Sequence, residues 1–434
     1  MPEAALAASA KLYRPKLATM LVEGYGPTDM RHDAMAGLTV AIVALPLSMA
    51  IAMASGVSPD RGLYAAIVGG FVVSALGGSR FQIGGPAGAF IVLVSATVAR
   101  FGVDGLLLAV LLSGAMLTLL GLLRLGSLIR HIPHAVTVGF TAAIAVTILA
   151  SQLKDLFGLR LAGPEPGPVV PKLAALANAA PTASVAAFGV ALGVIAIALA
   201  IRKLRPLWPS MLVAVAAASA VAALGHLPVE TIGSRFGGIP HGLPAPHLPS
   251  ITAAKLVAIL PTALSFTLLG GIESLLSAVV ADGMTGRRHR SNMELTAQGL
   301  ANMASAMFGG IAVTGTIART ATNVRAGAHS PVAGMLHAAF LLAFMLLAAP
   351  LASFVPVSAL AGVLVLVAWN MAEKPQIANL LRSWETGAVL AATFVLTVLR
   401  DLTIGILAGC LLAVAFWAVA RLRRRTVSVE HAQP

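Results

Sequence analysis

Two glycine-rich stretches decide the fold, Gly84-Gly85-Pro86-Ala87-Gly88-Ala89 and Gly309-Gly310-Ile311-Ala312-Val313-Thr314-Gly315-Thr316. Each leads into an apolar segment, 87–99 and 316–327. Both segments are shorter than the ~17–25 residues of an ordinary membrane-spanning helix. Paired short segments of this kind are typical of transporters, in which the N-termini of two half-helices form a substrate site near the middle of the membrane. The alternative is that the glycines only allow neighbouring helices to pack closely.

The composition around these stretches is that of a membrane protein. Of 434 residues, 58% are hydrophobic and only 10% are charged, whereas soluble domains carry about 25% charged residues. So few charges cannot cover a water-exposed surface, so most of the chain is expected to face the lipid bilayer. The net charge of +13 would suggest a nucleic-acid partner in a soluble chain. Here it indicates cytoplasmic loops rich in Lys and Arg, and no nucleic acid is expected.

Apolar segments recur along the chain, and we count 14 of them in two sets of seven. The first set is 35–55, 61–78, 87–99, 104–123, 133–151, 183–201 and 209–225. The second set is 256–281, 292–308, 316–327, 331–350, 356–371, 386–399 and 402–420. The two short segments are third in their sets, and because seven is odd the two halves have opposite orientations. The sequence therefore predicts an all-α polytopic membrane protein with half-helices at its third and tenth segments.

Charge predicts the orientation, because both ends of the chain are basic and an even number of spans leaves them on one side. The flanking cations are Lys11, Arg14, Lys16, Arg421, Arg423, Arg424 and Arg425. We expect both termini in the cytoplasm and the chain in the inner membrane of a bacterium. The expected parts are a cytoplasmic segment (1–30), a first seven-segment repeat (31–225), an external linker (226–255), a second repeat (256–421) and a cytoplasmic basic tail (422–434).

Arg319 is the cation that falls inside a predicted span. A guanidinium in the membrane interior costs ~2.5–3.5 kcal/mol on insertion scales, so it must face a partner or a cavity. Beside two helix N-termini, whose N–H groups and dipoles favour anions, it predicts an anion site. The alternative is a structural ion pair with Glu273, and both arrangements can occur in alternate states.

Glu273 lies near the middle of the eighth segment, within Gly270-Gly271-Ile272-Glu273-Ser274-Leu275-Leu276-Ser277. A carboxylate inside the membrane is typical of proton relays and ion pathways. It predicts proton exchange near neutral pH, or a cation site shared with Ser277 one turn further on. The plainer alternative is a packing carboxylate with all its hydrogen bonds satisfied.

Three further features have simpler interpretations. Pro46 is expected to break the first span, either to line the cavity or as a packing kink. Glu294, Gln298 and Asn302 form one polar stripe that predicts interhelical hydrogen bonds. Asp282 is expected to end the eighth helix.

The histidines have no metal-ligand spacing, and no Walker A loop or GxSxG elbow occurs. No enzyme activity, metal or cofactor is therefore expected, apart from a coupling ion.

Four motifs in combination resemble the SulP family of sulfate permeases, solute carrier family 26. They are Ile83-Gly84-Gly85-Pro86, Ile272-Glu273-Ser274-Leu275-Leu276, Asp282-Gly283-Met284-Thr285-Gly286 and Ala318-Arg319-Thr320-Ala321-Thr322-Asn323-Val324-Arg325-Ala326-Gly327. The resemblance runs from about Asp33 to Leu422. It is strongest to the bacterial C4-dicarboxylic acid transporter type, through the stretches 271–295 and 365–371.

The resemblance implies a 7+7 inverted repeat with a core domain (spans 1–4 and 8–11) and a gate domain (spans 5–7 and 12–14), as in uracil permeases. It implies an anion between the two half-helices, in front of Arg319. The implied substrate-binding residues are Pro46, Leu47, Pro86, Ala87, Gly88, Gly315, Thr316, Ala318 and Arg319, and the implied ion-coupling residues are Glu273 and Ser277.

Three departures from the family pattern qualify these implications. Many members have Gln where this chain has Leu47, so the usual polar contact is missing. Sodium-coupled bicarbonate members have Asp where this chain has Glu273, which favours a proton over sodium. Most members end in a cytoplasmic STAS domain, and this sequence, which stops soon after Arg425, is expected to lack one.

The sequence thus predicts a secondary active transporter of small anions that works by alternating access and forms a homodimer. The leading prediction is proton-coupled uptake of a C4-dicarboxylate, such as fumarate or succinate, or of sulfate. One alternative is a bicarbonate or sulfate transporter that uses sodium coupling or anion exchange. Another is an anion channel. A nucleobase is disfavoured, because only 5% of the residues are aromatic.

Overall fold

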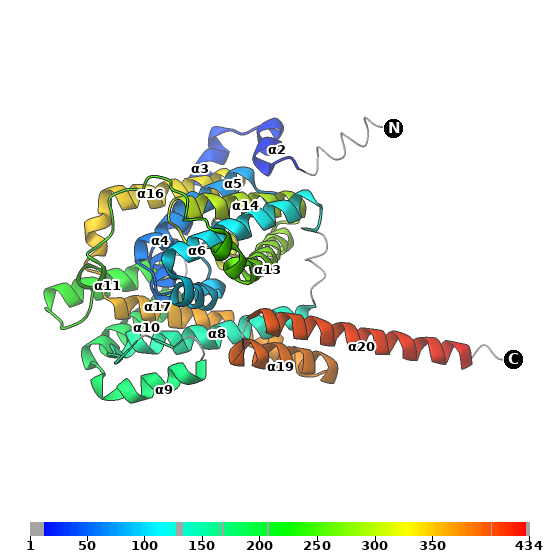
Figure 1. Cartoon of the computed structure of the whole chain (residues 1–434). Coiled ribbons are helices and arrows are strands. Elements are labelled where there is room, and N and C mark those ends of the chain that lie inside the picture. Colours follow the sequence, from blue (N-terminus) through cyan, green and yellow to red (C-terminus); the bar gives the residue numbers. More distant parts are fainter. Residues whose placement is uncertain are drawn as a thin grey trace.

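The computed structural model describes residues 13–126, 133–163, 165–166, 169–205, 208–400 and 402–430, and these are mostly helical (Figure 1). The elements before residue 127 are α2 (Lys16–Glu23), α3 (Pro27–Ala54), α4 (Pro59–Tyr64), the π-helix η1 (Ala65–Gly69), α5 (Gly70–Leu76), β1 (Gly84–Gly85), η2 (Gly88–Phe90) and α6 (Ile91–Leu122). The next are α8 (His134–Phe157), α9 (Val169–Ala179), η3 (Ala180–Thr182), α10 (Val185–Leu204), α11 (Ser210–Leu224) and α12 (Ile232–Phe236).

The second half of the chain begins with a helix that is long enough to cross a membrane with a tilt. Its elements are α13 (Ala253–Thr285), α14 (Ser291–Met307), β2 (Thr314–Gly315), α15 (Ile317–Arg325), α16 (Val332–Ala352), α17 (Val357–Met371), α18 (Lys374–Leu380), α19 (Trp384–Leu399) and α20 (Leu402–Glu430). Within the described ranges, seven helices are long and apolar enough to span a membrane, and three shorter apolar helices accompany them. The chain is therefore a helical membrane protein, and the count of 14 spans stays a prediction.

The segments predicted at 87–99 and 104–123 are two arms of one helical stretch that bends at Gly102. Gly102 has φ 70° and ψ −176°, far from helical values. Glycine adopts such angles at little cost because it has no Cβ. The bend lets η2 and the first part of α6 run in a different direction from the rest of α6.

Pro46 does not break the first span, contrary to the prediction. α3 continues through it from Pro27 to Ala54, and Pro46 and its neighbours are buried. Proline removes the hydrogen bond from its own nitrogen and crowds the carbonyl group four residues earlier, and inside a packed helical bundle neighbouring groups can compensate for both effects.

Among the helices that lie in stretches where no span was predicted are α9 and α12. α9 lies in the stretch between α8 and α10, and α12 lies in the linker predicted at 226–255. At 11 residues α9 is too short to cross a membrane. Neither helix carries the long apolar run by which spans are recognised in a sequence.

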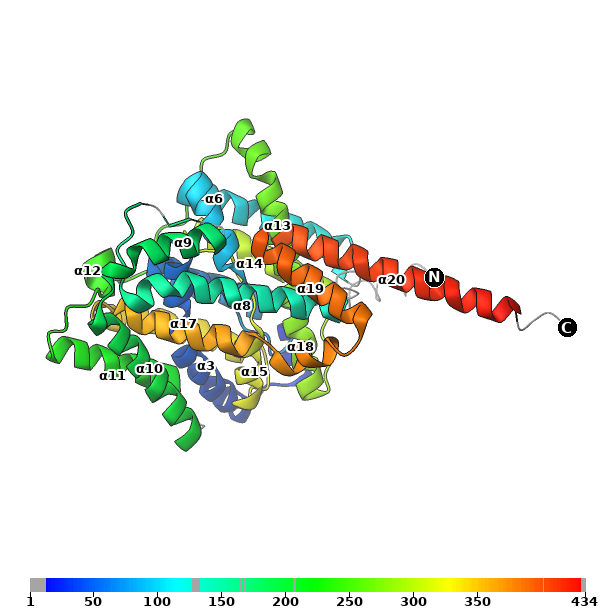
Figure 2. The same ribbon diagram turned by 90° about the horizontal axis from the view of Figure 1, so that it is seen from below.

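The helices pack in two groups (Figures 1 and 2). In the first, α3 packs against α16, and α6 packs against α13 and α14. In the second, α8 packs against α17 and α19, and α10 packs against α11 and α17. Each group combines helices from both halves of the sequence, so each half contributes to two packed bodies.

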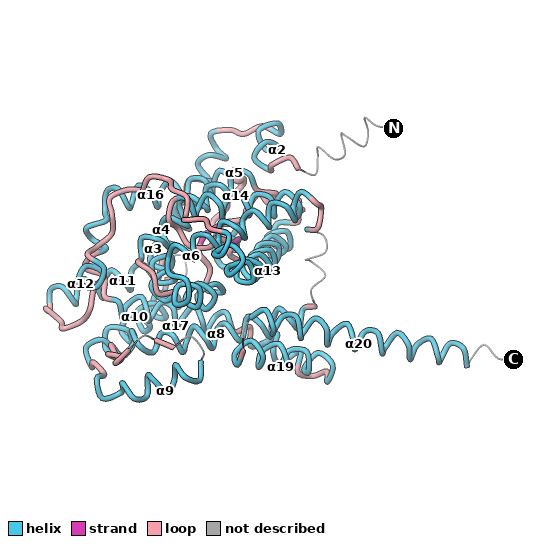
Figure 3. The backbone as a smooth tube through the Cα atoms, viewed as in Figure 1, coloured by secondary structure: helices cyan, strands magenta, loops and turns pink. Residues whose placement is uncertain are grey.

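A short antiparallel sheet lies among the helices of the first group (Figure 3). In it, Gly84 of β1 pairs with Gly315 of β2, and Gly85 pairs with Thr314. The two glycine-rich stretches singled out in the sequence therefore meet. We call the paired strands β1 and β2 the crossing. η2 begins three residues after β1 ends, and α15 begins two residues after β2 ends. Two helix N-termini therefore lie next to the crossing.

Candidate functional site

Hydrogen bonds fix the two strands of the crossing relative to one another. The Thr316 nitrogen donates to the Ile83 carbonyl oxygen at 3.0 Å. The Ile83 nitrogen donates to Oγ1 of Thr320, on the first turn of α15, at 3.1 Å. The structure thus holds five residues that were predicted to bind the anion at adjacent helix starts: Pro86, Ala87, Gly88, Thr316 and Ala318.

At two glycine positions of the crossing, an added side chain would displace a neighbouring polar side chain. A Cβ on Gly315 would lie 1.9 Å from Nε2 of Gln82, and a Cβ on Gly85 would lie 2.2 Å from Nη1 of Arg319. Both distances are far below van der Waals contact. The absence of side chains therefore lets the Gln82 amide and the Arg319 guanidinium approach the backbone.

The polar stripe on α14 supports the crossing. Asn302 forms hydrogen bonds with both backbone groups of Val313. Its Oδ1 accepts from the Val313 nitrogen at 2.9 Å, and its Nδ2 donates to the Val313 oxygen at 2.8 Å. Gln298 Nε2 also donates to the Val313 oxygen, at 2.6 Å. The stripe therefore satisfies a nonhelical stretch of backbone, whereas the sequence predicted bonds between helices. Without these partners, the buried peptide groups of residue 313 would be costly.

Arg319 is buried behind the crossing, with 2% of its surface exposed. Its Nη2 donates to the Pro86 carbonyl oxygen at 3.0 Å and to Oγ of Ser48 on α3 at 3.3 Å. Its Nε and Nη1 have no hydrogen-bond partner among the described residues. The predicted ion pair with Glu273 is not formed in this structure, and no carboxylate of the part of the chain that the structure describes pairs with Arg319.

Glu273 and Ser277 lie one turn apart on α13, but their partners differ. The Ser277 hydroxyl donates to Oγ1 of Thr320 at 3.0 Å, which ties α13 to α15. The Glu273 side chain forms no hydrogen bond or ion pair that the described residues record. Ser277 is therefore hydrogen-bonded to α15 at the crossing and not to Glu273. Glu273 is the ionisable side chain on this part of α13.

The other predicted residues divide by exposure. A thin exposed edge of 8–9% remains on Leu47, Ala87, Thr316 and Glu273, and Ala318 is exposed. Ser48, Ser277 and Thr320 are completely buried behind them. Pro46 and Leu47 belong to the buried part of α3 that also carries Ser48.

The second group of helices covers Gly88, since a Cβ there would lie 3.1 Å from Cδ1 of Ile148 and 3.4 Å from Sδ of Met371.

Sequence reasoning missed two polar side chains of this site, Ser48 and Gln82. Gln82 Nε2 donates to Oγ of Ser274 on α13 at 2.8 Å, while its buried Oε1 has no partner among the described residues. Its position directly before the glycine-rich stretch was a usable signal. Ser48 gave none, because its contact with Arg319 joins residues that are 271 positions apart.

The arrangement is chemically suited to an anion. Two helix starts and a guanidinium with two unpartnered nitrogen atoms lie together at the crossing, and each of these favours negative charge.

Comparisons with known proteins identify the family of the chain. The profile of the sulfate permease family matches residues 30–395. A Bacillus subtilis protein, the putative sulfate transporter YvdB, is 44% identical over 398 residues, which cover 91% of this chain and 75% of that protein. The bicarbonate transporter BicA of Picosynechococcus sp. is 31% identical over 396 residues, covering 89% of this chain and 69% of the relative.

Solved structures show the same fold. The transmembrane domain of a cyanobacterial bicarbonate transporter BicA matches with a TM-score of 0.79 at 30% identity, covering 88% of this chain and 98% of that one. The murine Slc26a9 anion transporter in its inward-facing state matches with a TM-score of 0.85 at 18% identity, covering 95% of this chain and 72% of that one. These relatives are named as transporters, which are not enzymes. The chain belongs to the sulfate permease family of multi-pass membrane anion transporters.

Proposed function

We propose that this chain is a secondary active transporter that moves a small anion across the membrane by alternating access. The observation that carries the proposal is the buried guanidinium of Arg319, which lies at the crossing of β1 and β2 with two nitrogen atoms unpaired. A buried cation without a counter-ion is costly unless an anion occupies the space in front of it. The bound anion would lie near Ala87, Gly88, Gly315, Thr316 and Ala318.

The proposed substrate is a C4-dicarboxylate or sulfate. The relative named a putative sulfate transporter, at 44% identity, supports an oxyanion. The two relatives named bicarbonate transporters, at 31% and 30% identity, make bicarbonate the alternative. A site built mainly from backbone N–H groups and one guanidinium accepts each of these anions in chemical terms.

The proposed coupling ion is a proton, carried by Glu273. This carboxylate is buried on a membrane helix and lacks an ion-pair partner, and it lies on the same helix as Ser277, which is bonded to the crossing. Protonation of Glu273 would change the charge on α13, the helix that Ser277 bonds to α15 at the crossing, and would so link the proton to the anion. Sodium coupling and anion exchange are the alternatives.

We also propose the wider architecture predicted from the sequence: 14 spans, two inverted repeats (31–225 and 256–421) and both termini in the cytoplasm of a bacterial inner membrane. The two groups of packed helices support core and gate domains, since each contains helices from both halves of the chain. The transporter would work as a homodimer, with the core domain moving against the gate domain.

Uptake of labelled fumarate, sulfate and bicarbonate into proteoliposomes tests the proposal. Saturable uptake of fumarate or sulfate that rises with an inward proton gradient supports the proton-coupled carrier. Uptake of bicarbonate alone would show that bicarbonate is the substrate instead of fumarate or sulfate. Uptake that follows a sodium gradient would show that sodium is the coupling ion instead of the proton. Electrical current at rates far above carrier turnover would show that the protein is a channel and not a carrier.

A further inference from the structure

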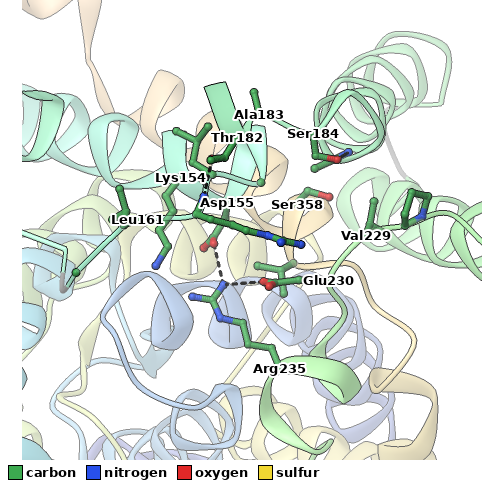
Figure 4. Close-up of a pocket in the computed structure, with 17 residues that line it drawn as sticks. Lys154, Asp155, Leu161, Thr182, Ala183, Ser184, Val229, Glu230, Arg235 and Ser358 are labelled. Atoms are coloured by element: carbon green, nitrogen blue, oxygen red, sulfur yellow. Dashed lines mark hydrogen bonds and ion pairs between the residues drawn. The ribbon is translucent and has the colours of Figure 1, made fainter. Parts of the chain in front are cut away.

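A cavity of about 640 Å³ lies away from the crossing, where the C-terminal end of α8 meets the N-terminal ends of α10 and α17 (Figure 4). The loop after α8, the stretch 228–230 and Arg235 of α12 complete its wall. Its volume is that of a small-molecule site. None of the residues assigned above to the anion site lines it, so it is a separate feature of the molecule.

The charged groups of this cavity leave a positive excess. Arg235 Nη1 lies 2.8 Å from Oδ1 of Asp155 and 3.8 Å from Oε2 of Glu230, and Figure 4 shows dashed lines from Arg235 to both carboxylates. Both carboxylates are thus directed to Arg235. Lys154 and Arg160 also line the cavity, and neither forms an ion pair with another described residue. Two cations therefore remain for a ligand.

Two helix N-termini reinforce this positive charge. α10 begins after Ser184, whose side chain accepts from the Ala187 nitrogen at 3.2 Å, and α17 carries Ser358 in its first turn. Ser184 and Ser358 both line the cavity. Helix N-termini attract anions through their free N–H groups and dipoles.

Ser358 supplies an independent indication of a ligand. It is only 3% exposed, and its Oγ has no hydrogen-bond partner among the described residues. A buried hydroxyl without a partner is unfavourable, because it has lost its bonds to water without replacement. A ligand in the cavity would supply that partner.

We infer that this cavity binds a second small anion, an oxyanion or a carboxylate, separately from the crossing. The predicted topology places it on the external side, within the proposed gate domain. The ligand would contact the end of α8, the starts of α10 and α17, and the free cations Lys154 and Arg160. It would therefore hold these three helices together.

Equilibrium dialysis of purified full-length protein against ³⁵S-labelled sulfate tests this inference. The Arg319→Gln protein, which lacks the guanidinium at the crossing, should keep one saturable sulfate site. Adding Lys154→Gln and Arg160→Gln should weaken that site by about tenfold or more, because charged hydrogen-bond donors are lost. Ser358→Ala, a small change in a helix, should weaken it less while preserving the fold.

The matched control is Arg100→Gln, which removes an exposed cation from the same predicted side of the membrane but outside the cavity. It should bind sulfate like its parent. The inference is overturned if Arg319→Gln alone abolishes all saturable binding, or if the cavity variants bind sulfate as the control does. Both outcomes are measured by sulfate binding alone, so they test the inference whether or not the protein transports sulfate.

Discussion

The guanidinium of Arg319 donates to the carbonyl oxygen of Pro86 at 3.0 Å, across 233 positions of sequence. The bond joins α15 to the stretch between β1 and η2, and so joins the two halves of the chain at the candidate site. Because Pro86 offers a neutral acceptor, the bond orients the guanidinium without cancelling its charge. The charge is left for an anion.

Arg319→Gln should weaken anion binding by about 10- to 100-fold, because a hydrogen bond to a charged group is worth about 1.5–3 kcal/mol. Binding is measured by equilibrium dialysis with the transported anion. Arg325→Gln is the matched control, since Arg325 is exposed at the far end of the same helix. Equal affinity in the two variants would reduce Arg319 to a packing role.

Glu273→Gln should abolish the accumulation of anion driven by a proton gradient, because glutamine cannot take up or release the coupled proton. Exchange of labelled for unlabelled anion should persist in part, since the groups at the crossing are unchanged. Both are measured in the same proteoliposomes. Glu385→Gln, at an exposed position in the first turn of α19, serves as control. Proton-driven accumulation at the wild-type level in Glu273→Gln would remove this residue from coupling.

Gly85→Ala should lower anion affinity without touching any charged residue. The new methyl group would lie 2.2 Å from Nη1 of Arg319 and would displace the guanidinium from its place. The expected loss is smaller than that of Arg319→Gln, because the charge is kept. Gly283→Ala is the control, since a Cβ there meets nothing within 4 Å. A Gly85→Ala protein with unchanged affinity would show that the guanidinium position is unimportant for binding.

Asn302→Ala should destabilise the protein by about 1–3 kcal/mol, because it leaves the buried N–H group of Val313 without a partner and removes one of the two donors to its carbonyl oxygen. Thermal unfolding in detergent measures the change, with Asn379→Ala at an exposed position of α18 as control. Equal unfolding temperatures for the two variants would mean that the crossing does not depend on the α14 stripe.

The sequence predicted that the two glycine-rich stretches and Arg319 belong to one site, but not that the stretches pair as β1 and β2 or which contacts Arg319 makes. Paired glycine-rich stretches and the cost of a charge inside a membrane are local signals, and they led to the two segments that meet as β1 and β2. The bond from Arg319 to Ser48 depends on how α3 packs, which no local pattern encodes. The course of α3 through Pro46 was mispredicted for the same reason, since packing overrode the tendency of proline to interrupt a helix. The bonds of Ser277 to Thr320 and of Asn302 to Val313 likewise became visible only in three dimensions.

The most direct test of the central claim is a crystal structure of the protein with selenate, a heavier analogue of sulfate that anomalous scattering locates. We expect a peak in front of the crossing, within hydrogen-bond distance of Arg319 and of the first N–H groups of η2 or α15. A second peak is expected in the cavity at the end of α8. A protein that transports sulfate but shows no selenate at the crossing would contradict this assignment of the transport site.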